Sequence, residues 1–482
     1  MSIEVRPLGV RCNLSCIYCY QNHMRDAGNF GPPYDMEKMK QALLAEGGPF
    51  ALFGGEALLV PKKDLEELWK FGLEKFGHNG IQTNGSLIDD EHIALFKKYK
   101  VHVGFSIDGP DELNDARWAG SLEKTRENTR KSINNLKRVL EAGVSASVII
   151  TLHRKNASSP EKLEKLASWI KEIHSWGVQA IRLHNLELDG ELTKKTLALT
   201  PEENIFAFSY LLRLKDEVPS LQIDVFDDIY KMLKEVDDGM ATCTWRACDP
   251  YTTRAVRGVE GNGQRSNCGR TNKEGIDFFK ADEEGFERYY ALYYTPQAYG
   301  GCEGCRFFIY CKGQCPGTAI DGDWRNKSSD CRLWKYLFET MESRVLQEGV
   351  VPLTLSPVRP LVEQELLNGW KSGVNLSVGQ ALRRVAQKLG VMPDQLLSQG
   401  SALFSNLGLS APSMPQGGYF QGNQMLHGDH YDHEDNGFHQ DQGPKEEVPV
   451  TVGYQRGGTF HADEHGDHND HGDHTDLPEA KS

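Results

Sequence analysis

The chain has 482 residues, enough for two or three domains, and its net charge is −14. Residues 411–482 hold nine Asp and five Glu against two Lys and one Arg, so most of that charge lies there, and no basic surplus remains to bind a nucleic acid by its phosphates. No apolar run is long enough to cross a bilayer, and the N-terminal residues lack the basic patch and apolar stretch of a signal peptide. We therefore expect a cytoplasmic protein with no membrane partner, in which eleven cysteines favour metal binding over disulfide bonds.

Short apolar segments alternate with helical patterns through the first part of the chain. The predicted strands are residues 3–7, 49–53, 80–83, 101–107, 145–152 and 178–184, and the clearest predicted helices between them are 35–45, 63–76, 122–142 and 160–174. Such alternation indicates a parallel sheet with helices outside it. We predict an α/β fold, a partial (β/α)6 barrel of the TIM type, followed by a small cysteine-rich domain and a disordered tail.

The predicted domains follow from composition along the chain. The barrel is assigned to residues 1–200, a helical connector to 201–242, a loop-rich cysteine domain to 243–345, a helical appendage to 346–410 and a disordered tail to 411–482. Within the appendage, Ser377 and Gln380 predict a capped helix that ends at Gly390.

Polar and glycine motifs follow the predicted strands, where barrels of this type carry their chemistry. They are Cys12 to Cys19 after the first strand, Gly54-Gly55-Glu56 after the second, Thr83-Asn84-Gly85 after the third, Ser106 to Pro110 after the fourth and His184-Asn185 after the sixth. We expect these residues to share one site.

Three cysteines, Cys12, Cys16 and Cys19, lie in the first of these motifs. Thiolates are soft ligands that suit iron–sulfur clusters and zinc. Three closely spaced thiolates can hold three irons of a 4Fe–4S cluster and leave the fourth iron open, as a catalytic site requires. The alternative is a structural zinc site completed by a distant ligand.

The spacing of this triad, with an aromatic residue at Tyr18, resembles the radical SAM superfamily. The resemblance implies that S-adenosylmethionine chelates the open iron and is cleaved reductively, which yields a 5′-deoxyadenosyl radical that abstracts hydrogen atoms. It also implies a set of cofactor-binding residues, namely Tyr18, Gly54, Gly55, Glu56, Ser106, Asp108, Arg117 and Ser121.

The resemblance also implies which part of S-adenosylmethionine each motif would contact. The Gly54-Gly55-Glu56 segment would receive the methionine amino group, and the segment with Ser106 and Asp108 would lie near the ribose. Arg117 and Ser121 fall where relatives contact the methionine carboxylate.

Eight further cysteines lie downstream, in a pattern that includes Gly263 five residues before Cys268 and resembles the SPASM domain. They are Cys243, Cys248, Cys268, Cys302, Cys305, Cys311, Cys315 and Cys331. Eight thiolates suit two fully ligated 4Fe–4S clusters, so three clusters in all are expected. The resemblance implies one set of Cys302, Cys305, Cys311 and Cys331, and a second set of Cys243, Cys248, Cys268 and Cys315. Two zinc sites are the alternative.

With all eleven cysteines used, no free thiol remains to return a hydrogen atom to a substrate, which argues against a peptide epimerase. Gly269 and Arg270 follow Cys268 where sulfatase-activating relatives have Asp, which puts that activity in doubt. We expect an enzyme that oxidises or cross-links side chains of a ribosomal precursor peptide or protein, with a reductant such as flavodoxin or ferredoxin. A dehydrogenase of a small molecule and a metal-handling protein with zinc-bound cysteines are the alternatives. No catalytic side chain is identified.

The C-terminal tail repeats the motif His-Gly-Asp-His-Xaa-Asp from His427, His465 and His471, and it holds nine of the sixteen histidines. Three interpretations stay open. It is a solvated acidic tail, a binding segment for a divalent metal such as nickel, zinc or copper, or a substrate of the enzyme itself.

Overall fold

The computed structural model describes residues 3–28, 33–188, 190–249, 252, 256–270, 283–295 and 299–397. The tail repeats and its three interpretations lie outside these residues. Within them, no helix is long and apolar enough to span a bilayer.

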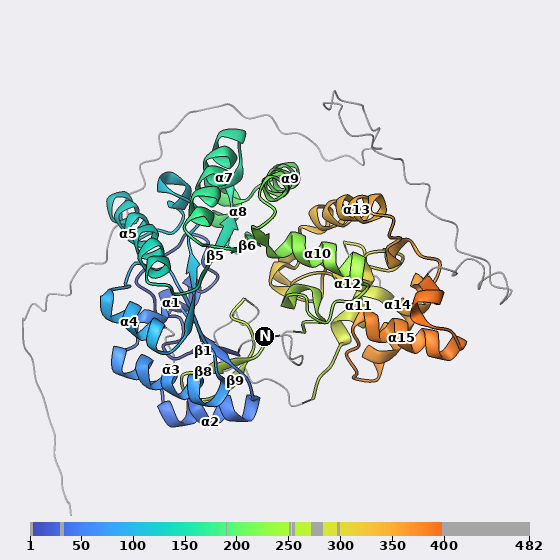
Figure 1. The fold of residues 1–482 in the computed structure, drawn as a ribbon, viewed down its shortest axis with the longest axis horizontal. Helices are drawn as coiled ribbons and strands as arrows, with labels where there is room; N and C mark the ends of the chain where they lie inside the picture. Colours follow the sequence, from blue (N-terminus) through green and yellow to red (C-terminus); the bar gives the residue numbers. More distant parts are fainter. Residues whose placement is uncertain are drawn as a thin grey trace, which may run out of the picture. The chain divides into compact units, whose positions relative to one another are not determined.

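One sheet of nine strands organises the first part of the chain (Figure 1). The strands are β1 (Ile3–Arg6), β2 (Phe50–Leu52), β3 (Asn79–Thr83), β4 (Val101–Ser106), β5 (Ala146–Leu152), β6 (Ala180–Asn185), β7 (Gln222–Ile223), β8 (Gly258–Glu260) and β9 (Arg265–Ser266). Their order across the sheet is β7-β6-β5-β4-β3-β2-β1-β8-β9. Neighbours from β7 to β8 are parallel, for example Val5 beside Leu52, and only β8 and β9 pair antiparallel. The predicted α/β fold with an open parallel sheet of barrel strands is confirmed.

Helices connect and cover these strands. Those of the barrel region are α1 (Asn22–Asp26), α2 (Met36–Glu46), α3 (Lys62–Phe76), α4 (Asp90–Lys98), α5 (Leu122–Glu141), α6 (Arg154–Ala157), α7 (Pro160–Ser175), α8 (Glu191–Leu197), α9 (Pro201–Glu217) and α10 (Asp224–Glu235), with the short 3-10 helices η1 (Ala57–Leu59) and η2 (Asp111–Asn114). Figure 1 shows α2, α3, α4, α5 and α7 along the outer side of the sheet. Buried strand residues such as Val103, Phe105 and Val148, each 0% exposed, form the core beneath them.

The later part of the described chain has shorter elements. They are η3 (Cys243–Trp245), α11 (Glu287–Tyr294), α12 (Phe308–Cys311), η4 (Pro316–Thr318), η5 (Ile320–Gly322), α13 (Cys331–Gln347), η6 (Leu353–Leu355), α14 (Arg359–Lys371) and α15 (Val378–Leu389). The helix predicted from Ser377 is confirmed, because the Ser377 and Gln380 side chains form a capping box and Gly390 ends α15 in the left-handed region at φ 69°.

The pairing of β8 with β1 was not anticipated. These strands come from the cysteine-rich segment, yet Val259 lies beside Val5 at the edge of the barrel sheet. Arg6, at the end of β1, donates to Glu260 and Ser266 on β8 and β9, which fixes this contact. The segment before Cys268 is thereby anchored to the barrel, and the domain boundaries given above stay predictions.

Candidate functional site

The loop that carries Cys12, Cys16 and Cys19 is held by main-chain hydrogen bonds on two sides. On one side, Ser15 N–H donates to the Trp118 carbonyl at 2.7 Å and Ile17 N–H donates to the Ala116 carbonyl at 2.8 Å. On the other side, two residues of the glycine motif after β2 support the loop. Gly55 and Glu56 donate their N–H groups to the carbonyls of Gly9 and Arg11, at 2.9 and 2.8 Å.

The second glycine of that motif is required by space. A Cβ atom at Gly55 would lie 2.1 Å from the Arg11 carbonyl oxygen and 2.5 Å from that of Val10. Only glycine lets the chain after β2 approach the cysteine loop so closely. The motif therefore supports the loop that carries the triad, a role that its sequence alone does not reveal.

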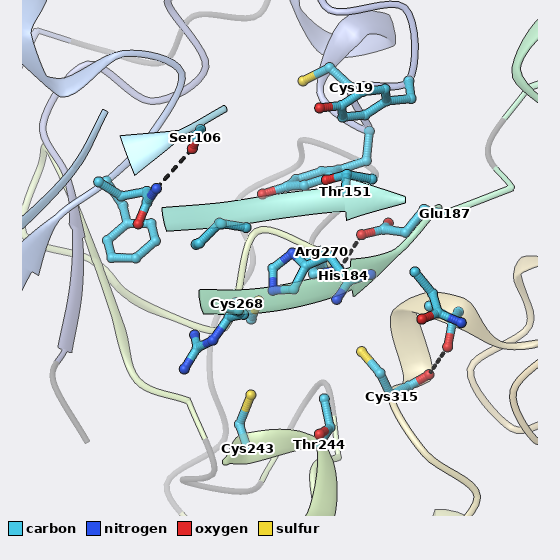
Figure 2. A pocket seen from close by; sticks show the side chains of 18 of the residues that line it. Cys19, Ser106, Thr151, His184, Glu187, Cys243, Thr244, Cys268, Arg270 and Cys315 are labelled. Carbon is cyan, nitrogen blue, oxygen red and sulfur yellow. Dashed lines mark hydrogen bonds and ion pairs between the residues drawn. The ribbon is translucent and has the colours of Figure 1, made fainter. Parts of the chain in front are cut away.

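A cavity of about 320 Å³ lies against this loop (Figure 2). Its walls include all three cysteines of the loop and four from the downstream region, namely Cys243, Cys248, Cys268 and Cys315. In the view of Figure 2, Cys19 lies at one end, while Cys243, Cys268 and Cys315 lie at the other and His184 and Arg270 lie between. We call these four downstream residues the inner set.

The other four cysteines gather elsewhere. Cys302, Cys305, Cys311 and Cys331, here called the outer set, line a separate cavity of about 30 Å³. Gln314 and Trp334 line both cavities and so form part of the wall between them. This division is the one that the resemblance implies, and the role of these residues as ligands stays a prediction.

Among the residues with a described position, no three His, Cys, Asp or Glu side chains converge as they would around a single ion. Cluster ligands have a looser requirement, because each thiolate binds a different iron.

Burial keeps most of these thiols protonated in the metal-free chain. It raises the pKa of Cys12 and Cys243 to about 11, and that of Cys16 and Cys302 to about 12. Each site would therefore release protons when it binds metal, and the metal would stabilise thiolates that the protein interior otherwise disfavours.

The residues expected to bind the cofactor do not all reach the cavity. Tyr18, Gly54, Gly55, Ser106 and Arg117 line it, whereas the other three are absent from its walls. Ser121 instead caps α5 by accepting a hydrogen bond from Lys124 N–H at 3.2 Å.

Glu56 and Asp108 are buried in protein contacts. The Glu56 carboxylate accepts hydrogen bonds from Thr83 Oγ1 at 2.7 Å and from the N–H groups of Leu58 and Asn84 at 3.0 and 2.9 Å. These contacts give Glu56 a structural role between β2 and β3, and its contact with a cofactor stays a prediction.

Asp108 is the centre of a buried polar cluster behind the cavity wall. Its carboxylate accepts hydrogen bonds from Tyr18 at 2.5 Å, from Arg117 at 2.8 Å and from Thr151 N–H at 2.9 Å, and His153 lies 3.3 Å away. Burial alone raises the pKa of this carboxyl, but Arg117 and His153 outweigh it and hold the pKa well below its usual range. Asp108 thereby fixes two cavity residues, Tyr18 and Arg117.

Several cavity residues carried no assigned role in the sequence. Two ion pairs line the wall, Arg182 with Asp224 at 2.9 Å and Arg270 with Glu187. Figure 2 shows the second pair beside His184. In the sequence, His184 could be found from its position at the end of β6. Arg270 could be found from its position two residues after Cys268.

His184 lies in an environment that disfavours its protonation. Burial lowers its pKa well below the usual value, and three arginines, Arg270, Arg182 and Arg117, lower it further, although Asp108 opposes them. The imidazole lines the cavity between the triad and the inner set.

Comparison with known proteins finds similarity in the first part of the chain. The family described as Radical SAM superfamily matches residues 7–184. A serine-type anaerobic sulfatase-maturating enzyme of Bacteroides thetaiotaomicron is 32% identical over 172 residues, which cover 33% of this chain and 41% of that protein. The sporulation killing factor maturation protein SkfB of Bacillus subtilis is 31% identical over 155 residues, which cover 30% of this chain and 34% of that protein. The matched stretch is thus less than half the length of either relative.

A solved structure shares the fold over a longer stretch. Native anSMEcpe with bound AdoMet superposes with a TM-score of 0.55 at 20% identity, over 72% of this chain and 98% of the other. This match covers a larger share of the chain than the family model, which matches residues 7–184. Together with the loop of three cysteines after β1, these findings identify a radical SAM domain at residues 7–184 of this chain.

Proposed function

We propose that this protein is a radical SAM enzyme that oxidises or cross-links side chains of a precursor peptide or protein. The superfamily uses a 4Fe–4S cluster and S-adenosylmethionine, which together supply a carbon-centred radical able to abstract hydrogen from unactivated C–H bonds. In this proposal the triad holds that cluster, and the inner and outer sets each hold a further 4Fe–4S cluster.

One observation carries the proposal. The three triad cysteines and the four cysteines of the inner set line a single cavity, and its volume of about 320 Å³ is within the range of small-molecule sites. A target side chain in this cavity would lie between a site that starts radical chemistry and one suited to accept an electron. Removal of a hydrogen atom and then of an electron is a two-electron oxidation, so the shared cavity favours oxidation.

The donor sets fit these groups. The triad offers three thiols beside open space, as a cluster with one exchangeable position requires, while each of the other sets offers four thiols around one cavity. Arg117 and Tyr18, both fixed by Asp108, would orient the cofactor at the cavity wall.

The proposed substrate class rests on the relatives. The two that are described above are named as a maturase of sulfatases and as a maturation protein of a killing factor, and both names imply a protein or peptide substrate. Sulfatase maturation itself is not proposed for this chain, because Gly269 and Arg270 follow Cys268 where sulfatase-activating relatives carry Asp.

Anaerobic purification and iron analysis test the cluster assignment. The wild-type protein is expected to hold about twelve irons per chain, four for each cluster. Cys16→Ala, Cys268→Ala and Cys331→Ala should each reduce the content to about eight, while the exposed control Met240→Ala keeps about twelve. A colourless protein that holds zinc and forms no 5′-deoxyadenosine on reduction would favour the metal-handling alternative and contradict the proposal.

Product analysis tests the substrate class. Incubation of the reduced enzyme with S-adenosylmethionine and peptides encoded by neighbouring reading frames should give a peptide product lighter by two hydrogen atoms. Cys268→Ala is expected to form 5′-deoxyadenosine yet to yield no such product. Oxidation of a small alcohol with every peptide unchanged would instead support the dehydrogenase alternative.

A further inference from the structure

Arg288 lies in the first turn of α11 and is 0% exposed. Its guanidinium donates to four main-chain carbonyls, those of Trp324 at 2.6 Å, Lys312 and Asn326 at 3.2 Å and Gly313 at 3.4 Å. All four belong to the segment between Cys311 and Cys331. One side chain therefore ties together the loops that present cysteines of both four-cysteine sets.

Arg288 differs from the other buried cations of the described chain. Four Arg or Lys residues are buried there, and three have carboxylate partners: Arg6 with Glu260, Arg117 with Asp108 and Lys312 with Asp238. No described carboxylate forms an ion pair with Arg288. A buried charge is costly unless an opposite charge lies nearby, so some other anion is needed to balance this guanidinium.

The guanidinium is tied to the chain next to cysteines of both sets. It binds the carbonyl of Lys312, which follows Cys311 of the outer set, and that of Gly313, two residues before Cys315 of the inner set. The Asp249 carboxylate, next to Cys248 in the chain, accepts hydrogen bonds from Thr252. Metal-bound thiolates at the two sets would supply the missing negative charge.

The loop between the two sets has an unusual backbone. Lys312, Gly313 and Gln314 lie in succession in the left-handed region, with φ of 49°, 72° and 64°. Two of the three are not glycine, so this conformation must be stabilised by the surroundings. The loop joins Cys311 of the outer set to Cys315 of the inner set, and Arg288 binds the carbonyls of its first two residues.

We propose that Arg288 is a positioning residue shared by the two four-cysteine sites, which holds the loop between Cys311 and Cys315 and offsets the negative charge of the thiolates bound to metal at both. The inference rests on the proposed function, because it requires a cluster at each set. It predicts that a single substitution changes both of these clusters and leaves the triad cluster unchanged.

The test compares Arg288→Gln and Arg288→Lys with wild type. Arg325→Gln is the matched control, because Arg325 lies between Trp324 and Asn326, whose carbonyls Arg288 binds, but is itself exposed and pairs with Asp323. The midpoint potentials of the three clusters are followed by EPR during a redox titration, together with iron content. Reduction adds negative charge, so loss of the guanidinium should move both auxiliary clusters to more negative potentials. Arg288→Lys, which keeps the charge, should stay near wild type in potential but lose iron faster to a chelator.

The possible outcomes separate the inference from the proposed function. A wild-type protein with about four irons would overturn the proposed function itself. If the wild type holds about twelve irons, unchanged auxiliary potentials in Arg288→Gln, or a change in only one cluster, would overturn the inference alone. If Arg288→Gln loses both auxiliary clusters while Arg288→Lys and Arg325→Gln retain them, the inference is supported. Equal loss in Arg288→Lys would show that charge is not the requirement, and would also overturn it.

Discussion

The Asp108 carboxylate lies 2.8 Å from the Arg117 guanidinium, and both residues are buried, Arg117 in the cavity wall and Asp108 behind it. Asp108→Asn removes the negative charge that balances Arg117. Because a broken buried pair leaves an uncompensated charge, we expect the free energy of unfolding to fall by about 3–5 kcal/mol. Urea unfolding under anaerobic conditions measures the change, and the exposed residue Asp111 on the same loop supplies the control Asp111→Asn.

The pH dependence of this effect follows from the lowered pKa of Asp108. A carboxyl with a lowered pKa in the folded chain contributes stability above its unfolded pKa of about 4 and loses that contribution as pH falls toward the folded value. The difference between Asp108→Asn and wild type should therefore be constant from pH 5 to pH 8. A difference below about 1 kcal/mol, or one that changes in this range, would contradict the assignment.

Gly55→Ala tests the support of the triad loop by the glycine motif. The added Cβ would lie 2.1 Å from the Arg11 carbonyl oxygen, so the loop with Cys12 has to move. We expect a loss of about 1–3 kcal/mol in stability and of about four irons per chain. At Gly239 the nearest neighbour would lie 3.5 Å away, so Gly239→Ala is the control. Full iron content in Gly55→Ala would show that the loop does not depend on this contact.

The Glu187–Arg270 pair is suited to a double-mutant cycle. Arg270→Met removes the guanidinium from beside a nearly buried carboxylate and should cost about 3–5 kcal/mol. The double variant Glu187→Gln/Arg270→Met should cost less than the sum of the single changes, because no unbalanced charge remains. For the exposed pair Lys171–Glu217 the same cycle should give a coupling of about 0–1 kcal/mol. Equal coupling in the two pairs would mean that burial does not strengthen the first.

Asp224 should make the free energy of unfolding depend on pH in the opposite direction to Asp108. Burial raises the pKa of its carboxyl to about 6, although Arg182 opposes the rise. The folded chain then binds this proton more tightly than the unfolded chain, so stability falls as pH rises from about 4 to about 6 and is level above that. Two units of pKa correspond to about 2–3 kcal/mol. The Asn side chain of Asp224→Asn does not titrate. The free energy of unfolding of this variant, relative to that of the wild type, should therefore rise by about this amount between about pH 4 and about pH 6.

The pattern of local sequence predicted much of the fold. The alternation of apolar strands and amphipathic helices placed β1 to β6 to within about two residues at each end, because each element has its own periodicity and caps. Strands β8 and β9 were missed, since segments of three and two residues in a cysteine-rich region carry no periodic signal. Their strand character comes from the hydrogen bonds that β1 offers at the sheet edge.

The same division holds for the site. Cysteine spacing is a local property, so the sequence alone predicted the triad as the ligands of a cluster and predicted that the motifs at the strand ends share a site. Whether a carboxylate points to a ligand or to its own backbone is decided by neighbours that are distant in sequence. Only the tertiary structure could therefore direct Glu56 to Thr83 and Asn84, bring the triad and the inner set to one cavity, and surround Arg288 with main-chain carbonyls and no described carboxylate to balance its charge.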